Sequence, residues 1–301
     1  MRHCSRNMLN CVSAVSEKWK TMFDEKTVVG IACIVADVDG TLLNNKKQIT
    51  GATVAAIRMA QQRGIPLTYA TGRHPLLIRD IIRAVGIEPE LPVIGCNGAI
   101  ITNYAQDFGI DCLPAQSAAR CLDIARRFGA DRYVFLPEKV VVSAQVPRAH
   151  LFAQWGMDIF EKGILEISRD ADMIRIQGNI IKLLIFDEDD EKLERIRRLV
   201  AEDEALWAVL SEKGNLDVTG RGVSKGQGVQ RLSAITGIPL SSIMALGDGE
   251  NDWEMLRLCG LGVAMGNAHE AARSAADWIT KTNDEDGAAW AIQALCAYRT
   301  R

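Results

Sequence analysis

The stretch "IVADVDGTLL", residues 34–43, ends an apolar run with two aspartates that stand one residue apart. The run begins at residue 28, is rich in β-branched residues and is typical of a strand covered on both faces of a sheet. Buried strands do not usually end in paired negative charges. Asp37 and Asp39 therefore indicate a chemical role, and the rest of the chain has to explain it.

Helix and strand patterns alternate after this first strand, at 49–65, 66–72, 75–86 and 92–101. Thr50 is the expected N-cap of the first helix, and Gly64 is its expected C′ residue. The resulting βαβαβ order predicts a parallel sheet with right-handed crossovers, in which 92–101 is the third strand.

The pattern changes in the middle of the chain and then returns. Between about 112 and 216, helix patterns alternate with paired strand patterns, which indicates a separate α+β unit. From 217 the doubly wound pattern resumes. We therefore predict an α/β protein with a Rossmann-like, doubly wound parallel sheet core at 28–111 and 217–301, an inserted α+β domain at 112–216 and an N-terminal extension at 1–27.

Composition excludes several classes of protein. The chain has 301 residues, 48% of them apolar, so a globular protein with a sizeable core is expected. A formal net charge of −3 gives no basic surface for nucleic acid. No apolar run approaches the ~18 residues of a membrane-spanning helix, so no membrane partner is expected. The eight cysteines form no C-x-x-C pair, which favours reduced thiols and a cytoplasmic location over a zinc site.

Polar residues follow several strands where a parallel sheet binds its ligands, outside the carboxyl ends of the strands. Four acids, a threonine and a lysine are expected at this one edge, together with neighbouring glycine, arginine and asparagine residues. The set is Asp37, Asp39, Thr71, Gly72, Arg73, Asn97, Lys225, Asp248, Asn251 and Asp252.

The aspartate pair has two simpler interpretations, a turn and a calcium-binding loop. Asp-Gly is a common turn signal, but a turn does not explain why more acids recur after the strand at 243–246. A calcium loop needs glycine at its sixth position and glutamate at its twelfth. Counted from Asp37, Gly40 is fourth and Gln48 is twelfth, so the calcium pattern fails.

Carboxylates that gather at one edge repel one another unless a cation holds them. Mg²⁺, a hard ion that prefers oxygen, suits Asp37, Asp39 and Asp248, and it commonly shares its site with phosphate. Lys225 could neutralise a phosphate from the other side, and Thr71 offers a hydroxyl beside backbone N–H groups. These features favour phosphoryl transfer, with one carboxylate as nucleophile and a neighbour as general acid and base.

Four segments resemble, in order, the four motifs of the haloacid dehalogenase superfamily: "DVDGTLLN", "TYATGR", "SKGQG" and "GDGENDWEM". The "NGA" after the third strand, "VAMGNA" and "TNDEDGAAWAI" resemble the Cof-type branch, whose members carry a C2 (type IIB) cap. The resemblance covers roughly residues 28–297, and no motif position is substituted.

The resemblance implies a role for each motif residue. Asp37 would attack phosphorus, and Asp39 would protonate the leaving oxygen and then activate water, with its backbone carbonyl on Mg²⁺. Thr71 and Lys225 would hold the phosphoryl group. Apart from the resemblance, Gly72, Arg73 and Asn97 follow strands at the same sheet edge and are candidate substrate contacts. Asp248 would ligate the metal, and Asn251 and Asp252 would support the metal or the phosphate.

The function expected is that of a Mg²⁺-dependent phosphatase acting on small phosphomonoesters such as sugar phosphates or phosphorylated cofactors. A phosphomutase and a non-enzymatic sensor of phosphorylated ligands are the alternatives. The partner is a small phosphorylated metabolite, and neither the physiological substrate nor the oligomeric state can be read from the sequence.

Several weaker candidates receive structural interpretations. His74 is expected to be a surface or capping residue, and the acidic run 187–192 is expected to begin a helix. Trp155, Met157 and Trp207 are expected in the core of the inserted domain. For Asn179 and Lys182, an active-site position and a solvated strand face both stay open.

Overall fold

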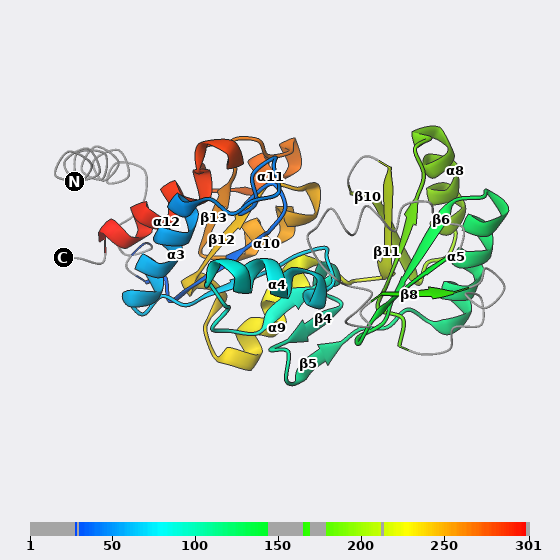
Figure 1. Ribbon diagram of the computed structural model, residues 1–301, viewed down its shortest axis with the longest axis horizontal. Helices are drawn as coiled ribbons and strands as arrows, with labels where there is room; N and C mark the ends of the chain where they lie inside the picture. The colour runs from blue at the N-terminus through cyan, green and yellow to red at the C-terminus, as the bar shows by residue number, and fades with distance from the viewer. Residues whose placement is uncertain (1–27, 29, 144–164, 169–178, 212–213, 299–301) are drawn as a thin grey trace. The chain divides into compact units, whose positions relative to one another are not determined.

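The computed structural model describes residues 28, 30–143, 165–168, 179–211 and 214–298 (Figure 1). The predicted N-terminal extension, the helix pattern at 148–157, and Trp155 and Met157 lie outside these residues. Two compact units make up the chain. The first contains the residues up to Ala70, Val85–Pro92 and the residues from Val229 onward, and the second contains Thr71–Ala84 and Val93–Gly228.

A five-stranded parallel sheet forms the centre of the first unit, in the order β14-β13-β12-β1-β2. The central strand β1 (Cys33–Ala36) is buried along its whole length, as the apolar run predicted, although it is shorter than that run. Its partners are β12 (Ile243–Gly247) and β2 (Leu67–Tyr69), and β13 (Leu261–Ala264) and β14 (Trp278–Ile279) complete the sheet. The predicted α/β class with a parallel sheet is confirmed.

The helices of the first unit lie on both sides of its strands (Figure 1). On one side α3 (Gly51–Gln62) packs against α12 (Gly287–Tyr298), and on the other α10 (Trp253–Leu258) packs against α11 (Glu270–Ala275). Thr50 caps α3 by accepting from the Thr53 N–H at 3.1 Å, and Gly64 beyond its end has a φ of 70°, so both predicted ends are confirmed. Short 3₁₀ segments are η2 (Leu240–Ser242), η3 (Glu250–Asp252) and η4 (Asn283–Glu285).

Two helices contain residues of both units. α4 (Pro75–Val85) has all but its last residue in the second unit. α9 (Lys225–Thr236) begins in the second unit and continues into the first. The pattern at 75–86 predicted α4, in which Pro75 occupies the first position and Gly86 lies just beyond the end.

The second unit contains a six-stranded sheet in the order β10-β11-β9-β6-β7-β8. Its strands are β6 (Asp131–Phe135), β7 (Val140–Ser143), β8 (Leu165–Ser168), β9 (Lys182–Phe186), β10 (Leu206–Leu210) and β11 (Asn215–Gly220). All neighbours are antiparallel except β7 and β8, and the predicted hairpin of β6 and β7 is confirmed.

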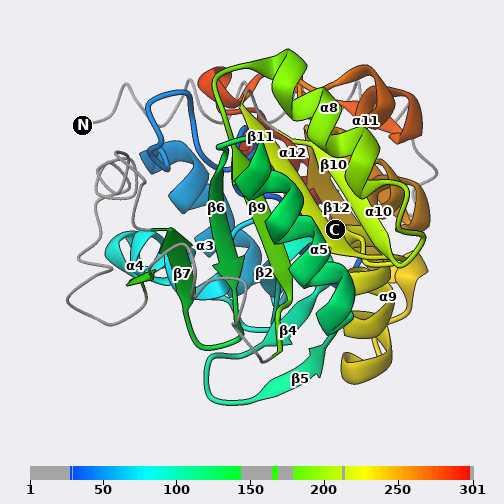
Figure 2. The same cartoon turned by 90° about the vertical axis from the view of Figure 1, so that its right-hand side faces the viewer.

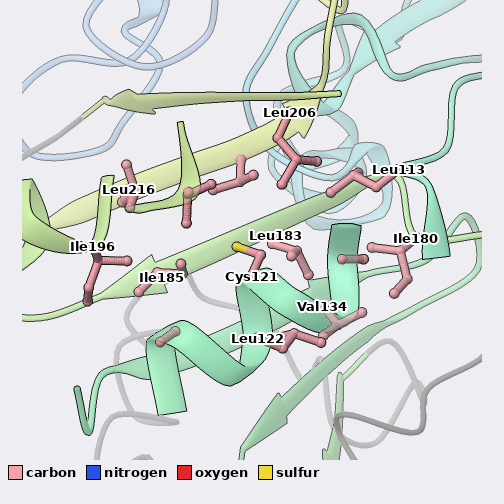
Figure 3. Close-up of a cluster of buried hydrophobic side chains, with 14 of the residues drawn as sticks. Leu113, Cys121, Leu122, Val134, Ile180, Leu183, Ile185, Ile196, Leu206 and Leu216 are labelled. Atoms are coloured by element: carbon pink, nitrogen blue, oxygen red, sulfur yellow. The ribbon is translucent and has the colours of Figure 1, made fainter. Parts of the chain in front are cut away.

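Two helices cover one face of this sheet, α5 (Ala115–Arg127) and α8 (Asp190–Val200) (Figure 2). Cys121 and Leu122 of α5 meet Leu183 and Ile185 of β9 in a buried cluster (Figure 3). Each fully buried leucine or isoleucine contributes about 1.5–3 kcal/mol, so this cluster is the main source of stability on that face. Asp189 is the N-cap of α8 and accepts from the Lys192 N–H at 3.0 Å, which confirms the helix-start interpretation of the acidic run.

A three-stranded antiparallel sheet corrects the prediction for residues 92–101. β3 (Val93–Gly95), β4 (Ile100–Thr102) and β5 (Asp107–Ile110) form this sheet, and the turn η1 (Cys96–Gly98) separates the first two. The prediction of a third parallel strand at 92–101 is therefore wrong. Cys96, Asn97 and Gly98 have φ angles of 51°, 58° and 102°, which an extended strand cannot contain.

Among the residues that the structure describes, no helix has both the length and the apolar character needed to cross a membrane.

Candidate active site

Asp37 and Asp248 meet because β1 and β12 are parallel neighbours in the first unit. Ala36 pairs with Leu246 in the sheet, and the Asp37 N–H donates to the Leu246 carbonyl at 2.8 Å. Each aspartate directly follows its strand, so the register alone places the two side chains at the same edge. The strand-end rule used on the sequence predicts this juxtaposition.

Three carboxylates gather at this edge. Oxygen atoms of Asp37, Asp248 and Asp252 all lie within 4.8 Å of one another. Asp37 is 4% exposed and Asp252 is 0% exposed, so water does little to screen their charges. An all-oxygen set of acids, two of them buried and Asp248 partly exposed, fits a hard cation such as Mg²⁺, which would offset their mutual repulsion.

The Asp252 carboxylate also shapes the loop that follows β12. Its Oδ2 accepts from the N–H groups of Asp248 and Gly249, at 3.0 and 2.8 Å. Asn251 folds back over the same loop, because a Cβ placed on Gly249 would lie 2.4 Å from its Oδ1. Asp252 thus fixes the backbone that carries Asp248, in agreement with a supporting role.

Gly40 approaches Asp248 too closely for any side chain. Its φ is 73°, in the left-handed region, and a Cβ placed there would lie 2.2 Å from Asp248 Oδ2. The next residue, Thr41, donates its hydroxyl to Asp248 Oδ1 at 2.8 Å. The turn after β1 therefore wraps around the Asp248 carboxylate, which explains the Gly-Thr pair in "DVDGTLL".

The Asp39 carboxylate faces a different partner. Its Oδ1 lies 2.9 Å from Nζ of Lys47, and its side chain is 19% exposed. In the described part of the chain, the group of acids whose oxygens lie within 4.8 Å of one another contains Asp37, Asp248 and Asp252 but not Asp39. Sequence reasoning singled out neither Lys47 nor Thr41.

A tight turn in the second unit carries Thr71, Gly72 and Arg73. The Arg73 N–H donates to the Thr71 hydroxyl at 3.1 Å, and Thr71 is buried. The Asn97 N–H donates to the Thr71 carbonyl at 3.0 Å, and a Cβ on Gly72 would lie 3.0 Å from Asn97 Oδ1. The structure therefore brings Asn97 against the Thr71 turn. Lys225, at the start of α9, is also buried.

Lys182, the first residue of β9, connects the turn at Thr71, Gly72 and Arg73 to the six-stranded sheet. Its Nζ lies 2.7 Å from Asp217 Oδ2 and 2.8 Å from the Gly72 carbonyl, and it faces the Phe135 ring. Asn97 donates to the same Asp217 oxygen at 3.1 Å. Lys182 is only 4% exposed, so the solvated interpretation is wrong for this residue, whereas Asn179 is exposed.

The sequence reasoning missed Asp217. The available signal was an acid between the apolar Leu216 and Val218 of the strand pattern "NLDVTG", because an acid inside a strand usually has a partner when it is buried.

His74 is a buried cap of α4. Its Nδ1 accepts from the Leu76 N–H at 3.2 Å, and its Nε2 lies 2.8 Å from the Leu136 carbonyl. Burial lowers the pKa of His74, although the hydrogen bond to Leu136 opposes that change. Capping was predicted correctly, but a surface position was not.

Trp207 corrects another prediction. Its side chain is 52% exposed on the edge strand β10, and the Arg221 guanidinium lies 6.0 Å from its ring centre. It is therefore not part of the core. An apolar strand pattern does not reveal that one face of an edge strand lacks a covering layer.

Known proteins are similar to this chain in sequence. A family model for haloacid dehalogenase-like hydrolases matches residues 34–292. The phosphatase YwpJ of Bacillus subtilis is 31% identical over 295 residues, a match that covers 87% of this chain and 99% of the relative. The 5-amino-6-(5-phospho-D-ribitylamino)uracil phosphatase YcsE of the same bacterium is 28% identical, with 88% and 96% covered.

Solved structures share the fold. A haloacid dehalogenase-like hydrolase from B. subtilis superposes with a TM-score of 0.77 at 29% identity, covering 87% of this chain and 99% of the other. The sugar phosphatase BT4131, described as a subclass IIB member, gives a TM-score of 0.74 at 23% identity, with 86% and 96% covered. At this level of identity the second likeness shows the fold alone.

Proposed function

Because the chain belongs to the haloacid dehalogenase-like hydrolases, as predicted, we propose that it is a Mg²⁺-dependent phosphatase of small phosphomonoesters. Sugar phosphates and phosphorylated cofactors are the proposed substrates. The observation that carries the proposal is the buried Asp37 at the end of β1, beside the Asp248 and Asp252 carboxylates. No other group of described acids combines burial, a strand end and close neighbours in this way.

Asp37 is the proposed nucleophile. One of its carboxylate oxygens forms a bond to phosphorus while the bond from phosphorus to the leaving oxygen breaks, which gives an aspartyl-phosphate. Water then attacks the same phosphorus, releases inorganic phosphate and returns Asp37 to its carboxylate form. Its position directly after a buried strand holds the nucleophile rigidly.

Asp39 is the proposed general acid and base. It gives its proton to the leaving oxygen in the first step and takes a proton from the attacking water in the second. The Asp39 carboxylate is not a member of the group formed by Asp37, Asp248 and Asp252, and this separation from the proposed metal ligands supports the assignment. The two aspartates of the "DVD" sequence can then do different work.

The proposed metal site uses Asp37, Asp248 and the backbone carbonyl of Asp39, with Asn251 and Asp252 in support. When bound, Mg²⁺ supplies positive charge that stabilises the negative charge of the phosphoryl oxygens. Asp252 supports Asp248 through the two backbone N–H groups that it accepts from.

Thr71 and Lys225 are proposed to bind the phosphoryl oxygens, with Gly72, Arg73 and Asn97 as further substrate contacts. A buried lysine and a buried threonine hydroxyl are suitable donors to phosphate. Residues 112–216 are proposed as the cap that selects the substrate, between core segments 28–111 and 217–301.

A cytoplasmic location belongs to the same proposal. Cys33, Cys96 and Cys121 are single, buried thiols, and burial raises the pKa of each to about 12. Protonated, inaccessible thiols act as small apolar side chains and need no oxidising compartment. Fractionation of the native cell, with immunodetection of the chain, tests the location.

A phosphate-release screen tests the function. The purified chain is incubated with sugar phosphates, nucleotides, FMN and pyridoxal phosphate, with Mg²⁺ or with EDTA, and substrates are ranked by kcat/KM. We expect Mg²⁺-dependent release from several small phosphomonoesters. Transfer to an added sugar acceptor would indicate a phosphomutase, and no release from any compound would favour a non-enzymatic sensor.

A further inference from the structure

Both oxygens of the Asp248 carboxylate accept a hydrogen bond from a side chain of the first unit. Thr41 donates to Oδ1 at 2.8 Å, and Asn267 Nδ2 lies 3.2 Å from Oδ2. Asn267 belongs to "VAMGNA", in the loop after β13, a segment that the resemblance singled out without giving it a role. The same Nδ2 donates to the Gly40 carbonyl at 2.9 Å.

A hydrogen bond from Asn283 determines which atom of the Asn267 amide faces Asp248. Its Oδ1 accepts from the backbone N–H of Asn283 at 2.9 Å, so the amide must present Nδ2 to Asp248 and Gly40. A flipped amide would point an oxygen at a carboxylate and a carbonyl, and would leave the Asn283 N–H facing a donor. The side chain can therefore serve only as a donor toward the acids.

Asn283 is itself held by the turn after β1. Its Nδ2 donates to the Leu43 carbonyl at 3.0 Å and to Asn45 Oδ1 at 3.2 Å. Asn45 in turn donates from its N–H and its Nδ2 to the two oxygens of Asp284, at 2.9 and 2.6 Å. These bonds join the segment after β1 and the segment after β14 into one rigid support behind Asn267.

We propose that Asn267 is a positioning residue. Its amide holds the Asp248 carboxylate and the turn at Gly40 in the conformation in which Asp248 binds the divalent cation. The proposal rests on the function proposed above, because it assigns the cation to the same acids. Donors behind a ligating carboxylate fix its rotamer and its charge distribution, and their loss usually lowers metal affinity by about 10–100-fold. Asn267 then acts through Asp248 and does not touch the substrate.

The test uses Asn267→Ala and Thr41→Val, which each remove one donor from Asp248. Mg²⁺ affinity is measured directly by calorimetry on the whole chain, and separately as the Mg²⁺ concentration that gives half-maximal phosphate release. We expect each variant to bind Mg²⁺ about 10–100-fold more weakly, with kcat largely restored at saturating Mg²⁺. Asn103→Ala is the matched control, because among the described residues the Asn103 side chain bonds only the N–H groups of its own turn.

The melting temperature distinguishes a positioning role of Asn267 from a structural role. The melting temperature in EDTA should change no more in Asn267→Ala than in Asn103→Ala, since Asn267 is exposed and its loss leaves no cavity. Mg²⁺ affinity within twofold of wild type in Asn267→Ala would overturn the proposal, whatever the result for Thr41→Val and whether or not phosphate is released. Absence of phosphate release in wild type, with Mg²⁺ binding that still depends on Asn267, would contradict the proposed reaction and leave the positioning role standing.

Discussion

Lys182 and Asp217 form a buried ion pair, 2.7 Å from Nζ to Oδ2, that holds the Gly72 carbonyl on one side and Asn97 on the other. Lys182→Met leaves the Asp217 carboxylate buried, with the Asn97 amide as its one remaining partner in the part of the chain that the structure describes. Breaking one side of a buried pair costs about 3–5 kcal/mol, so we expect a loss of that size in the free energy of unfolding. Urea denaturation followed by circular dichroism measures it.

The double variant Lys182→Met/Asp217→Leu is the control for this pair. Replacing both charges with apolar side chains of similar size removes the unpaired carboxylate, so we expect recovery of most of the lost stability. A double variant no more stable than Lys182→Met would show that the pair is not the cause of the loss.

Gly40→Ala should disturb the acids through sterics alone. The new Cβ would lie 2.2 Å from Asp248 Oδ2, at a φ of 73° that alanine adopts with strain. We expect at least tenfold weaker Mg²⁺ binding by calorimetry, in addition to a stability cost of about 1–2 kcal/mol. Gly64→Ala is the matched control, since its φ is 70° and its Cβ would meet nothing within 4 Å, so equal Mg²⁺ affinity in the two variants would contradict the steric account.

Asp248→Asn should weaken metal binding more than catalysis. The amide keeps the shape of the carboxylate but removes one negative charge from the group with Asp37 and Asp252. We expect phosphate release to fall by at least tenfold at low Mg²⁺ and to recover in part at high Mg²⁺. A titration of activity against Mg²⁺ decides, and an unchanged Mg²⁺ requirement would exclude Asp248 as a ligand.

His74 should make the protein sensitive to acid. Burial lowers its pKa below the ordinary value of 6.5, so the unfolded chain binds the extra proton first as the pH falls. The stability that the neutral ring contributes is complete above about pH 6.5 and is lost as the pH falls through the folded pKa. The cation would also place an N–H on Nδ1, facing the Leu76 N–H.

The measurement is the free energy of unfolding between pH 7 and 5. We expect His74→Gln to remove a slope of up to about 1.4 kcal/mol per pH unit from this profile. His269→Gln is the control, because His269 caps α11 through the same Nδ1 geometry but is exposed. Equal slopes in wild type and His74→Gln would refute the assignment.

The sequence was sufficient for those parts of the site that follow from strand order. Asp37 and Asp248 each come directly after a strand of a doubly wound sheet, so their meeting follows once β1 and β12 are neighbours. Helix ends such as Thr50 and Asp189 were also predictable, because a cap depends on residues a few positions away.

Features that depend on distant partners could not be predicted. For Lys182 the sequence left both an active-site position and a solvated strand face open, because its buried partner Asp217 lies on another strand. The break between β3 and β4 depends on positive φ angles at Cys96 and Asn97, which residue type alone does not dictate. Asn267 acquires its orientation from a backbone N–H that only the fold brings near.

The central claim is that the Asp37 carboxylate attacks phosphorus, and trapping the phosphorylated enzyme tests it most directly. Wild type and Asp37→Asn are each mixed with Mg²⁺ and a substrate from which wild type releases phosphate. The reactions are quenched in acid, and the digested protein is analysed by mass spectrometry. Asp107→Asn, at an exposed aspartate, is the control. We predict one phosphoryl group on the peptide that contains Asp37 in wild type and in Asp107→Asn, and neither a phosphoryl group nor phosphate release in Asp37→Asn. Phosphate release that survives in folded Asp37→Asn, or a phosphoryl group on another residue, would contradict the account.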